Sequence, residues 1–130
     1  EALAAFYRLH QLSSPEKAAF WTPTQRRFFD QLSLAASQGG WLRLYFLDVA
    51  GRPAAAMYTF AYAQQLLIYN SGFDPVTYAR LSVGNVLTAY TIQDAIAQGF
   101  QRYDFLRGNE EYKLRYRAVP EPIFTVELRR

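Results

Sequence analysis

The sequence has 130 residues, of which 51% are hydrophobic and 17% aromatic, so the chain is long and apolar enough for one domain with a buried core and is not intrinsically disordered. The net charge of +3 suits an anionic ligand such as a phosphate but is too small to indicate nucleic-acid binding by itself. The absence of cysteine excludes disulfides, a thiolate nucleophile and a Cys-based metal site, and the single histidine, His10, argues against a His-based metal cluster or a Ser-His-Asp triad.

Helix-like and strand-like segments follow one another in a definite order along the chain. Short turns separate three successive strands, which indicates an antiparallel meander, and a helix then crosses over to a further strand. We therefore expect an α+β (α/β) fold, a mixed sheet covered by helices, in one domain of residues 1–130. The expected helices cover residues 2–12, 23–38, 84–98 and 109–116, and the expected strands cover 41–48, 54–61, 66–70, 102–106 and 122–128.

Apolar spacing predicts which face of each long helix is buried. In the helix of residues 23–38 the expected inward positions are Phe28, Leu32, Ala35 and Ala36. In the helix of residues 84–98 they are Val86, Leu87, Tyr90, Ala95 and Ile96.

A candidate anion site precedes the third of these helices. A helix N-terminus offers free backbone N–H groups and the positive end of its dipole, which a pyrophosphate requires. Gly84 would let the backbone approach a phosphate closely, and Arg80 would add positive charge. Ser82, Val83 and Asn85 complete the expected loop. The alternative is an ordinary helix start, with Ser82 as N-cap and Gly84 as a turn residue.

Residues 103–113 place many polar and charged side chains directly after a short strand, which a segment that only packs would not do. Asp104, Glu110 and Glu111 are candidate general bases, and Tyr112 is a candidate proton donor. Asp104 would lie among apolar neighbours, and burial there would raise its pKa.

Lys113 and Arg107 are further candidate site residues of this stretch. Glu110 and Lys113 have the spacing of neighbours on one side of a helix, so they are either part of a catalytic group or a solvated ion pair. Arg107, beside Gly108 at a strand end, is expected to point into a cleft and contact substrate.

The order of residues 103–113 resembles a motif of the acetyltransferase-like proteins of cellulose and exopolysaccharide biosynthesis, the CelD-type branch of the Gcn5-related N-acyltransferase (GNAT) family. Ser82, Gly84 and Leu87 resemble the family's phosphate loop, although Val83 stands where proline is frequent. The resemblance implies a GNAT-like fold and an enzyme that uses acetyl-CoA or another acyl-CoA as co-substrate, without a metal. It implies a small amine or amino sugar as acceptor.

The same resemblance implies roles for residues outside the motif. A backbone N–H of Tyr69 or Asn70 would polarise the thioester carbonyl. Asp74 stands where the family has an aspartate after this strand, and its alternative role is to cap the next turn. His10 and Trp21 are similar to an upstream histidine and tryptophan of the family, which implies substrate contact for His10, whereas a lone helix histidine is more often structural.

Family members carry a second, N-terminal acyltransferase-like half, and the chain starts with Glu1 rather than Met, so we expect a C-terminal half with a paired domain as partner. No membrane span or signal peptide is visible, and we expect a cytoplasmic protein. Two alternatives stay open: a Fem-type transferase with an aminoacyl-tRNA donor, and a non-catalytic binding or supporting domain in exopolysaccharide biosynthesis.

Overall fold

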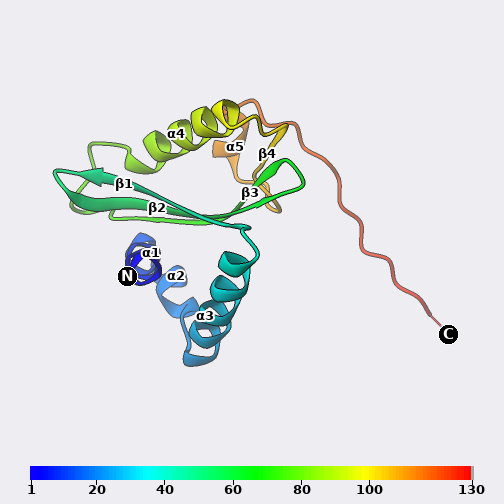
Figure 1. The fold of residues 1–130 in the computed structure, drawn as a ribbon, viewed down its shortest axis with the longest axis horizontal. Helices are drawn as coiled ribbons and strands as arrows, with labels where there is room; N and C mark the ends of the chain where they lie inside the picture. The colour runs from blue at the N-terminus through cyan, green and yellow to red at the C-terminus, as the bar shows by residue number, and fades with distance from the viewer. Residues whose placement is uncertain (130) are drawn as a thin grey trace.

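The computed structural model describes residues 1–129 and has one four-stranded sheet with helices on both faces (Figure 1). The three N-terminal helices cover one face, and the two later helices lie on the other (Figure 1). The expected α+β architecture is confirmed. The helices are α1 (Ala2–Ser13), α2 (Pro15–Phe20), α3 (Pro23–Gln38), α4 (Val83–Ala97) and α5 (Glu111–Arg115), and the strands are β1 (Leu42–Val49), β2 (Arg52–Tyr62), β3 (Gln65–Phe73) and β4 (Arg102–Asp104).

The strand order is β1-β2-β3-β4. β1, β2 and β3 form the expected antiparallel meander, and β4 runs parallel to β3 after the crossover through α4. β4 pairs only with Gln65–Leu67, whereas β3 continues to Phe73. Within the described residues, the outer edge of β3 beyond Leu67 therefore has no neighbouring strand.

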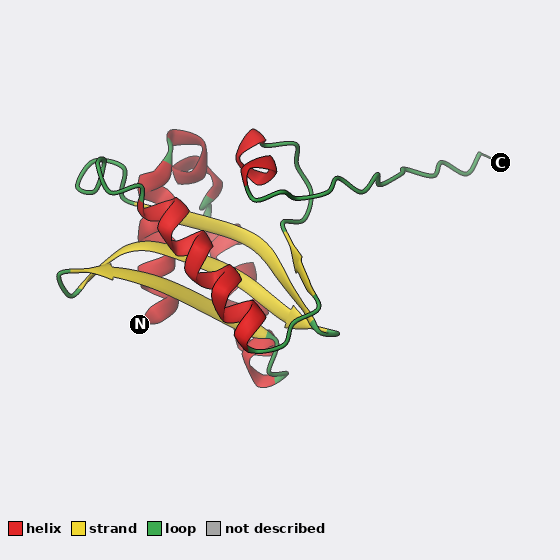
Figure 2. Ribbon diagram, turned by 90° about the horizontal axis from the view of Figure 1, so that it is seen from above, coloured by secondary structure: helices red, strands yellow, loops and turns green. Residues whose placement is uncertain are grey.

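The central strand β2 is buried on both faces because its side chains alternate between two apolar clusters. Ala55 and Met57 pack beneath α4, together with Leu87 and Ala95. Figure 2 shows α4 lying across this face of the sheet. On the opposite face the cluster is mainly aromatic and joins α1 and α3 to the sheet. The members of this second cluster are Phe6, Tyr7, Leu9, Phe29, Ala56 and Tyr58.

The expected buried face of α3 is correct in part, because Ala36 is buried and Leu32 packs against the aromatic cluster, whereas Phe28 and Ala35 are exposed. Phe28 is 57% exposed, and Phe29 is buried in its place. Ser33 is also buried, because its hydroxyl is hydrogen-bonded to the Tyr58 hydroxyl at 2.9 Å. A buried polar side chain with a partner carries little penalty, so apolar spacing alone could not identify this face.

The expected buried face of α4 needs the same correction. Val86, Tyr90 and Ile96 are exposed, whereas Thr88 and Thr91 are buried. The Thr91 hydroxyl donates to the carbonyl oxygen of Thr88 at 2.9 Å and is also hydrogen-bonded to the Tyr103 hydroxyl at 2.8 Å. Leu87 and Ala95 are buried as expected.

Several element ends also differ from expectation. β3 extends through residues 71–73, which we expected to be a loop. β4 ends at Asp104 rather than 106, because Leu106 has a left-handed φ of 57° and its N–H donates to the Asp104 carboxylate at 2.7 Å. α5 is shorter than expected and begins at Glu111.

The expected strand at residues 122–128 does not form in the described part of the chain. The segment is extended but pairs with no strand, and it runs away from the domain (Figures 1 and 2). A groove of about 980 Å³ lies between its beginning and β4, so β4 contacts this region through the Arg102–Glu121 ion pair at 3.0 Å rather than through strand pairing. Its apolar side chains are 75% to 94% exposed, and they are Ile123, Phe124, Val126 and Leu128.

Gly72 is the point where β3 touches α1 most closely. A Cβ at this position would overlap the backbone N and Cα atoms of His10. The absence of a side chain therefore sets the distance between the helix layer and the strand that borders the open edge.

We expect Gly72→Ala to lower the free energy of unfolding by about 3 kcal/mol, because backbone atoms cannot move aside as a flexible side chain would. Urea unfolding followed by circular dichroism would measure this. Gly84→Ala is the control, since a Cβ there meets only the Phe73 ring, at 3.6 Å, and stability should change little. Equal stability of Gly72→Ala and the parent protein would contradict the close packing.

Candidate functional site

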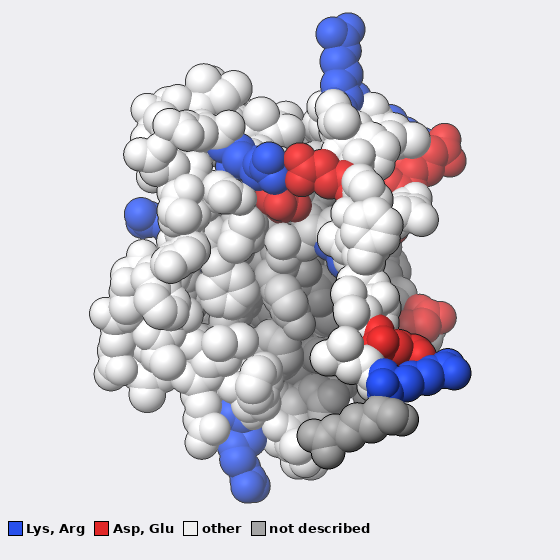
Figure 3. Space-filling model, turned by 90° about the vertical axis from the view of Figure 1, so that its right-hand side faces the viewer, with Lys and Arg blue, Asp and Glu red and all other residues white. Residues whose placement is uncertain are grey.

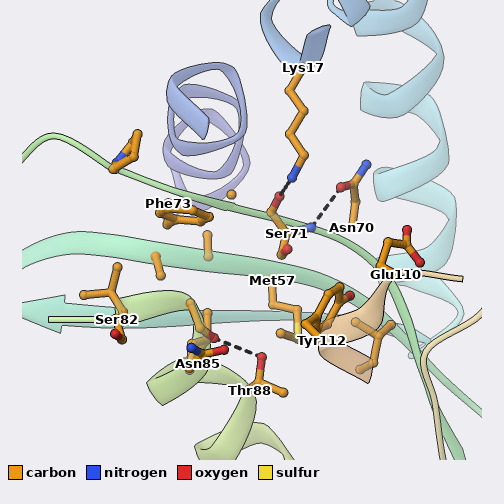
Figure 4. Close-up of a pocket in the computed structure, with 18 of the residues that line it drawn as sticks. Lys17, Met57, Asn70, Ser71, Phe73, Ser82, Asn85, Thr88, Glu110 and Tyr112 are labelled. Atoms are coloured by element: carbon orange, nitrogen blue, oxygen red, sulfur yellow. Dashed lines mark hydrogen bonds between the residues drawn. The ribbon is translucent and has the colours of Figure 1, made fainter. Parts of the chain in front are cut away.

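A cavity of about 630 Å³ lies where β3 and β4 part (Figure 4). Its walls are the open edge of β3, the start of α4 and the segment from Phe105 into α5. The expected site residues that line it are Tyr69, Asn70, Ser82, Val83, Gly84, Asn85, Arg107, Glu110, Tyr112 and Lys113. The expected site residues outside its lining are His10, Asp74, Arg80, Asp104 and Glu111.

The N-terminus of α4 faces the cavity without a side-chain cap. Ser82 occupies the N-cap position in a left-handed conformation, with φ 47°, and its side chain makes no capping hydrogen bond. By contrast, the Thr22 hydroxyl caps α3 by accepting from the N–H of Gln25 at 3.2 Å. The first turn of α4 also contains no acidic residue, so its N–H groups and dipole favour an anion. Arg80 is exposed beside this loop.

The open edge of β3 presents polar backbone groups next to the cavity. A register shift against β2 leaves Tyr69 without a partner residue, as in a β-bulge. The Asn70 side-chain oxygen accepts from the N–H of Ser71 at 2.9 Å, and the Lys17 ammonium donates to the carbonyl oxygen of Ser71 at 2.6 Å (Figure 4). The side chains of Asn70 and Lys17 thus bind the N–H and the carbonyl oxygen of Ser71 at the open edge of β3.

Lys113 orders the turn that leads into α5. Its side chain is buried, and its ammonium donates to the carbonyl oxygens of Leu106, Arg107 and Gly108 at 3.4, 3.2 and 3.2 Å. The same group pairs with the Glu110 carboxylate at 2.8 Å. The Lys113 ammonium therefore binds three carbonyl oxygens and one carboxylate, and these contacts fix the path of the chain along the cavity.

Glu110 and Tyr112 have opposite electrostatic environments at the cavity. The hydrogen bond from Lys113 lowers the pKa of Glu110, so its carboxylate is charged and weakly basic at neutral pH. Burial, and then the negative charge of Glu110, raise the pKa of Tyr112, which keeps its phenol protonated. Tyr112 can therefore donate a proton inside the cavity.

Three expected acidic residues lie away from the cavity. Asp104 lines the groove between β4 and the C-terminal segment, where its carboxylate accepts from Leu106. Glu111 is exposed at the start of α5. Asp74 caps the following turn by accepting from the N–H groups of Val76 and Thr77, at 3.0 and 2.9 Å, which lowers its pKa.

His10 is buried under the sheet, with 2% of its surface exposed. Its Nδ1 accepts from the Trp21 indole N–H at 2.9 Å, so a neutral ring carries its proton on Nε2, which is buried without a hydrogen-bond partner among the described residues. Burial, and then the charge of Lys17, lower the pKa of His10 to about 4. His10 is therefore neutral at pH 7.

Lys17 also lines the cavity, and it was not among the expected site residues. It lies in α2, a helix of 6 residues with no buried residue, and its contact with Ser71 of β3 joins positions that are far apart in the sequence. Its sequence neighbours would suggest an ordinary solvated lysine.

Residues 1–129 contain no group of three or more metal-ligating side chains that could hold an ion. In the same residues, no helix is long and apolar enough to cross a membrane.

The family model of the acetyltransferase (GNAT) domain matches residues 1–114 of the chain. No curated protein matches the sequence. Among solved structures, the chain is similar to the ribosomal-protein-S18-alanine N-acetyltransferase from Escherichia coli, with 25% identity and a TM-score of 0.56. That match covers 75% of this chain and 56% of the other, so the chain spans little more than half the length of that enzyme.

The chain is also similar to the aminoglycoside acetyltransferase meta-AAC0020 from an uncultured soil metagenomic sample, solved in complex with sisomicin and with trehalose. The identity is 13% and the TM-score 0.61, with 98% of this chain and 88% of the other covered. At this identity the likeness shows a shared fold.

The buried histidine predicts a pH-dependent loss of stability. In the unfolded chain the imidazole takes up a proton near pH 6.5, but in the folded chain it does so only near pH 4. The unfolded state thus binds more protons in this window, and the free energy of unfolding should fall by up to about 3 kcal/mol as the pH drops through it.

Urea unfolding at pH 7 and pH 4.5 would measure this loss, with His10→Asn as the comparison. Titrating carboxylates act equally in both proteins, so His10→Asn should show a smaller loss than the parent. An equal loss in the two proteins would mean that His10 protonates as readily in the folded chain as in the unfolded one.

Proposed function

The chain belongs to the acetyltransferase (GNAT) family, and we propose that it transfers an acetyl or other acyl group from an acyl-CoA to an amine by direct attack within a ternary complex. One observation carries the proposal: the uncapped N-terminus of α4 faces a cavity at the parting of β3 and β4. Such an end suits the pyrophosphate of CoA, since it offers N–H donors and a positive dipole end to a doubly charged group.

The donor would enter along the parting of the strands. Ser82, Val83, Gly84 and Asn85 would hold the pyrophosphate through the first turn of α4, and exposed Arg80 would add charge at the entrance. The pantetheine arm would replace the missing strand neighbour at the β3 edge. A backbone N–H of the bulged segment at Tyr69 or Asn70 would then donate to the thioester oxygen.

The chemistry needs no covalent enzyme intermediate. The neutral amine attacks the thioester carbon, the new C–N bond forms, and the C–S bond breaks with the electron pair going to sulfur. Tyr112 would supply the proton for that sulfur, because it lines the cavity and stays protonated at neutral pH.

A carboxylate would remove the proton from the attacking amine. Glu110 is the carboxylate that lines the cavity, so it would take this proton directly or through a water molecule. Asp104 and Glu111 would serve the reaction only at longer range, and Lys113 would serve it by holding the turn. Arg107 and the capping residue Asp74 are proposed to lie at the acceptor entrance, with His10 supporting the wall behind it.

The CelD-type branch and its biology are a further part of the proposal. The order of residues 103–113 supports that branch, and with it an amino sugar or small amine as acceptor, a cytoplasmic location and a paired N-terminal acyltransferase-like domain. The solved relatives are named as acetyltransferases of a protein alanine and of aminoglycosides, which supports an amine acceptor. Charged side chains form separate small groups on the face in Figure 3, which offers no continuous basic stripe for a tRNA donor.

We expect CoA, acetyl-CoA or a longer acyl-CoA to stabilise the domain by about 2.7 kcal/mol at about 100 times its Kd, which thermal unfolding would detect. Gly84→Asp should abolish this shift, because a carboxylate at the start of α4 repels phosphate, while the fold survives.

The control for that variant is Thr24→Asp, which adds the same charge at an exposed position in the first turn of α3, outside the lining of the cavity. An unchanged CoA shift in Gly84→Asp would remove the phosphate site from α4. No shift with any CoA in the folded parent domain would leave a different donor or a non-catalytic role as the better interpretation.

Tyr112→Phe should lower kcat by about a hundredfold with little change in the affinity for acetyl-CoA, because only the proton donor is lost. Thiol release at saturating substrates would measure kcat. Tyr90→Phe, which changes an exposed tyrosine of α4, should leave kcat unchanged. Full activity of Tyr112→Phe would exclude this residue as the proton donor.

A further inference from the structure

Lys17 brings a positive charge into the cavity without a negative partner. Its ammonium is held by the carbonyl oxygen of Ser71 at 2.6 Å, and none of the ion pairs in residues 1–129 includes it. The side chain is half-buried, and burial lowers its pKa. A cation that has lost water and has gained only a neutral acceptor remains open to an anion.

The other charges of the cavity do not compensate for Lys17. Glu110 is the acidic residue of the lining, and its carboxylate is paired with Lys113 at 2.8 Å. Arg107 also lines the cavity and takes part in no ion pair of the described residues. Lys17 and Arg107 are therefore two cations of the lining without an acidic partner among the described residues, and Arg107 also lines the groove beside β4.

Lys17 reaches the cavity from the opposite side of the sheet to the candidate phosphate loop. In Figure 4 its side chain descends from α2 to the β3 backbone at Ser71, while Ser82 and Asn85 lie across the strands on α4. Figure 1 places α2 and α4 on opposite faces of the sheet. Since the α4 side is proposed to hold the pyrophosphate, Lys17 lies where the second substrate would enter.

We propose that the acceptor is an amine that also carries an anionic group, a carboxylate or a phosphate, and that Lys17 binds this group with help from Arg107. The inference rests on the proposed acyl transfer and names its class of acceptor. An acceptor with amino groups alone would bring more positive charge to a cavity that already holds two uncompensated cations. An anionic group offsets that charge and gives Lys17 a partner that residues 1–129 do not supply.

Calorimetric titration of matched acceptor pairs would test this without any need for turnover. The pairs are glucosamine 6-phosphate with glucosamine, and alanine with ethylamine, titrated into the domain with and without saturating CoA. We expect the anionic member of at least one pair to bind about tenfold more tightly, as a charge-assisted hydrogen bond permits, and the two pairs distinguish phosphate from carboxylate.

The variants are Lys17→Met, Lys17→Arg and the control Arg27→Met, which removes the same charge from an exposed position of α3. Lys17→Met should reduce the preference to within about twofold and leave the affinity for the neutral member unchanged. Lys17→Arg should retain part of it, and Arg27→Met should retain all of it. Circular dichroism would establish that each variant is folded.

Three outcomes would overturn the inference. The members of both pairs could bind equally or not at all, or the preference could survive in Lys17→Met. Lys17→Met could also weaken CoA binding instead of acceptor binding, which would assign Lys17 to a phosphate of the donor. Because CoA affinity is titrated separately, failure of the parent domain to bind CoA would count against the acyl-CoA proposal and is distinguishable from a missing acceptor preference.

Discussion

The cavity exists because β4 pairs with β3 over only Gln65–Leu67 and then leaves the sheet. Leu106 turns the chain in a left-handed conformation, and the buried Lys113 ammonium holds the carbonyl oxygens that follow. Without that cation the three carbonyl oxygens would lose their common hydrogen-bond donor at the place where the strands part, and the turn would lose its geometry. A short parallel pairing and one buried charge thus keep the β3 edge open for a ligand.

The helix layer on the other face of the sheet depends on the same strand. Gly72 lets α1 lie directly on β3, and the Ser13 hydroxyl accepts from the N–H of Phe73 at 2.8 Å. His10, neutral and bonded to Trp21, fills the space beside this contact. The helices therefore do more than cover apolar surface, because they fix the position of the strand whose edge borders the cavity and bring Lys17 to it.

The helices and strands could be predicted from the sequence where a local feature, such as a short turn, determined them. Short turns between apolar strands predicted the meander, and the helix expected at residues 23–38 is α3. The buried faces of α3 and α4 followed only in part, because Ser33 and Thr91 are buried with hydrogen bonds to Tyr58 and Tyr103 that only the tertiary structure provides. The buried Thr88 hydroxyl is satisfied within its own helix by the carbonyl oxygen of Gly84. The alternating segment at 122–128 has the pattern of a strand, but a pattern cannot supply a neighbour.

In the candidate site, too, some lining residues could be predicted from the sequence and others could not. The α4 loop and Tyr112 could be found because a helix start and a polar stretch after a strand are local features. Lys17 could not, since nothing in its own helix distinguishes it and its importance comes from reaching Ser71 on β3. The net charge of +3 is likewise uninformative, because the pairing of Glu110 with Lys113 is what leaves Lys17 and Arg107 uncompensated. In this cavity the arrangement of pairs, and not the number of charges, decides what kind of ligand the electrostatics favour.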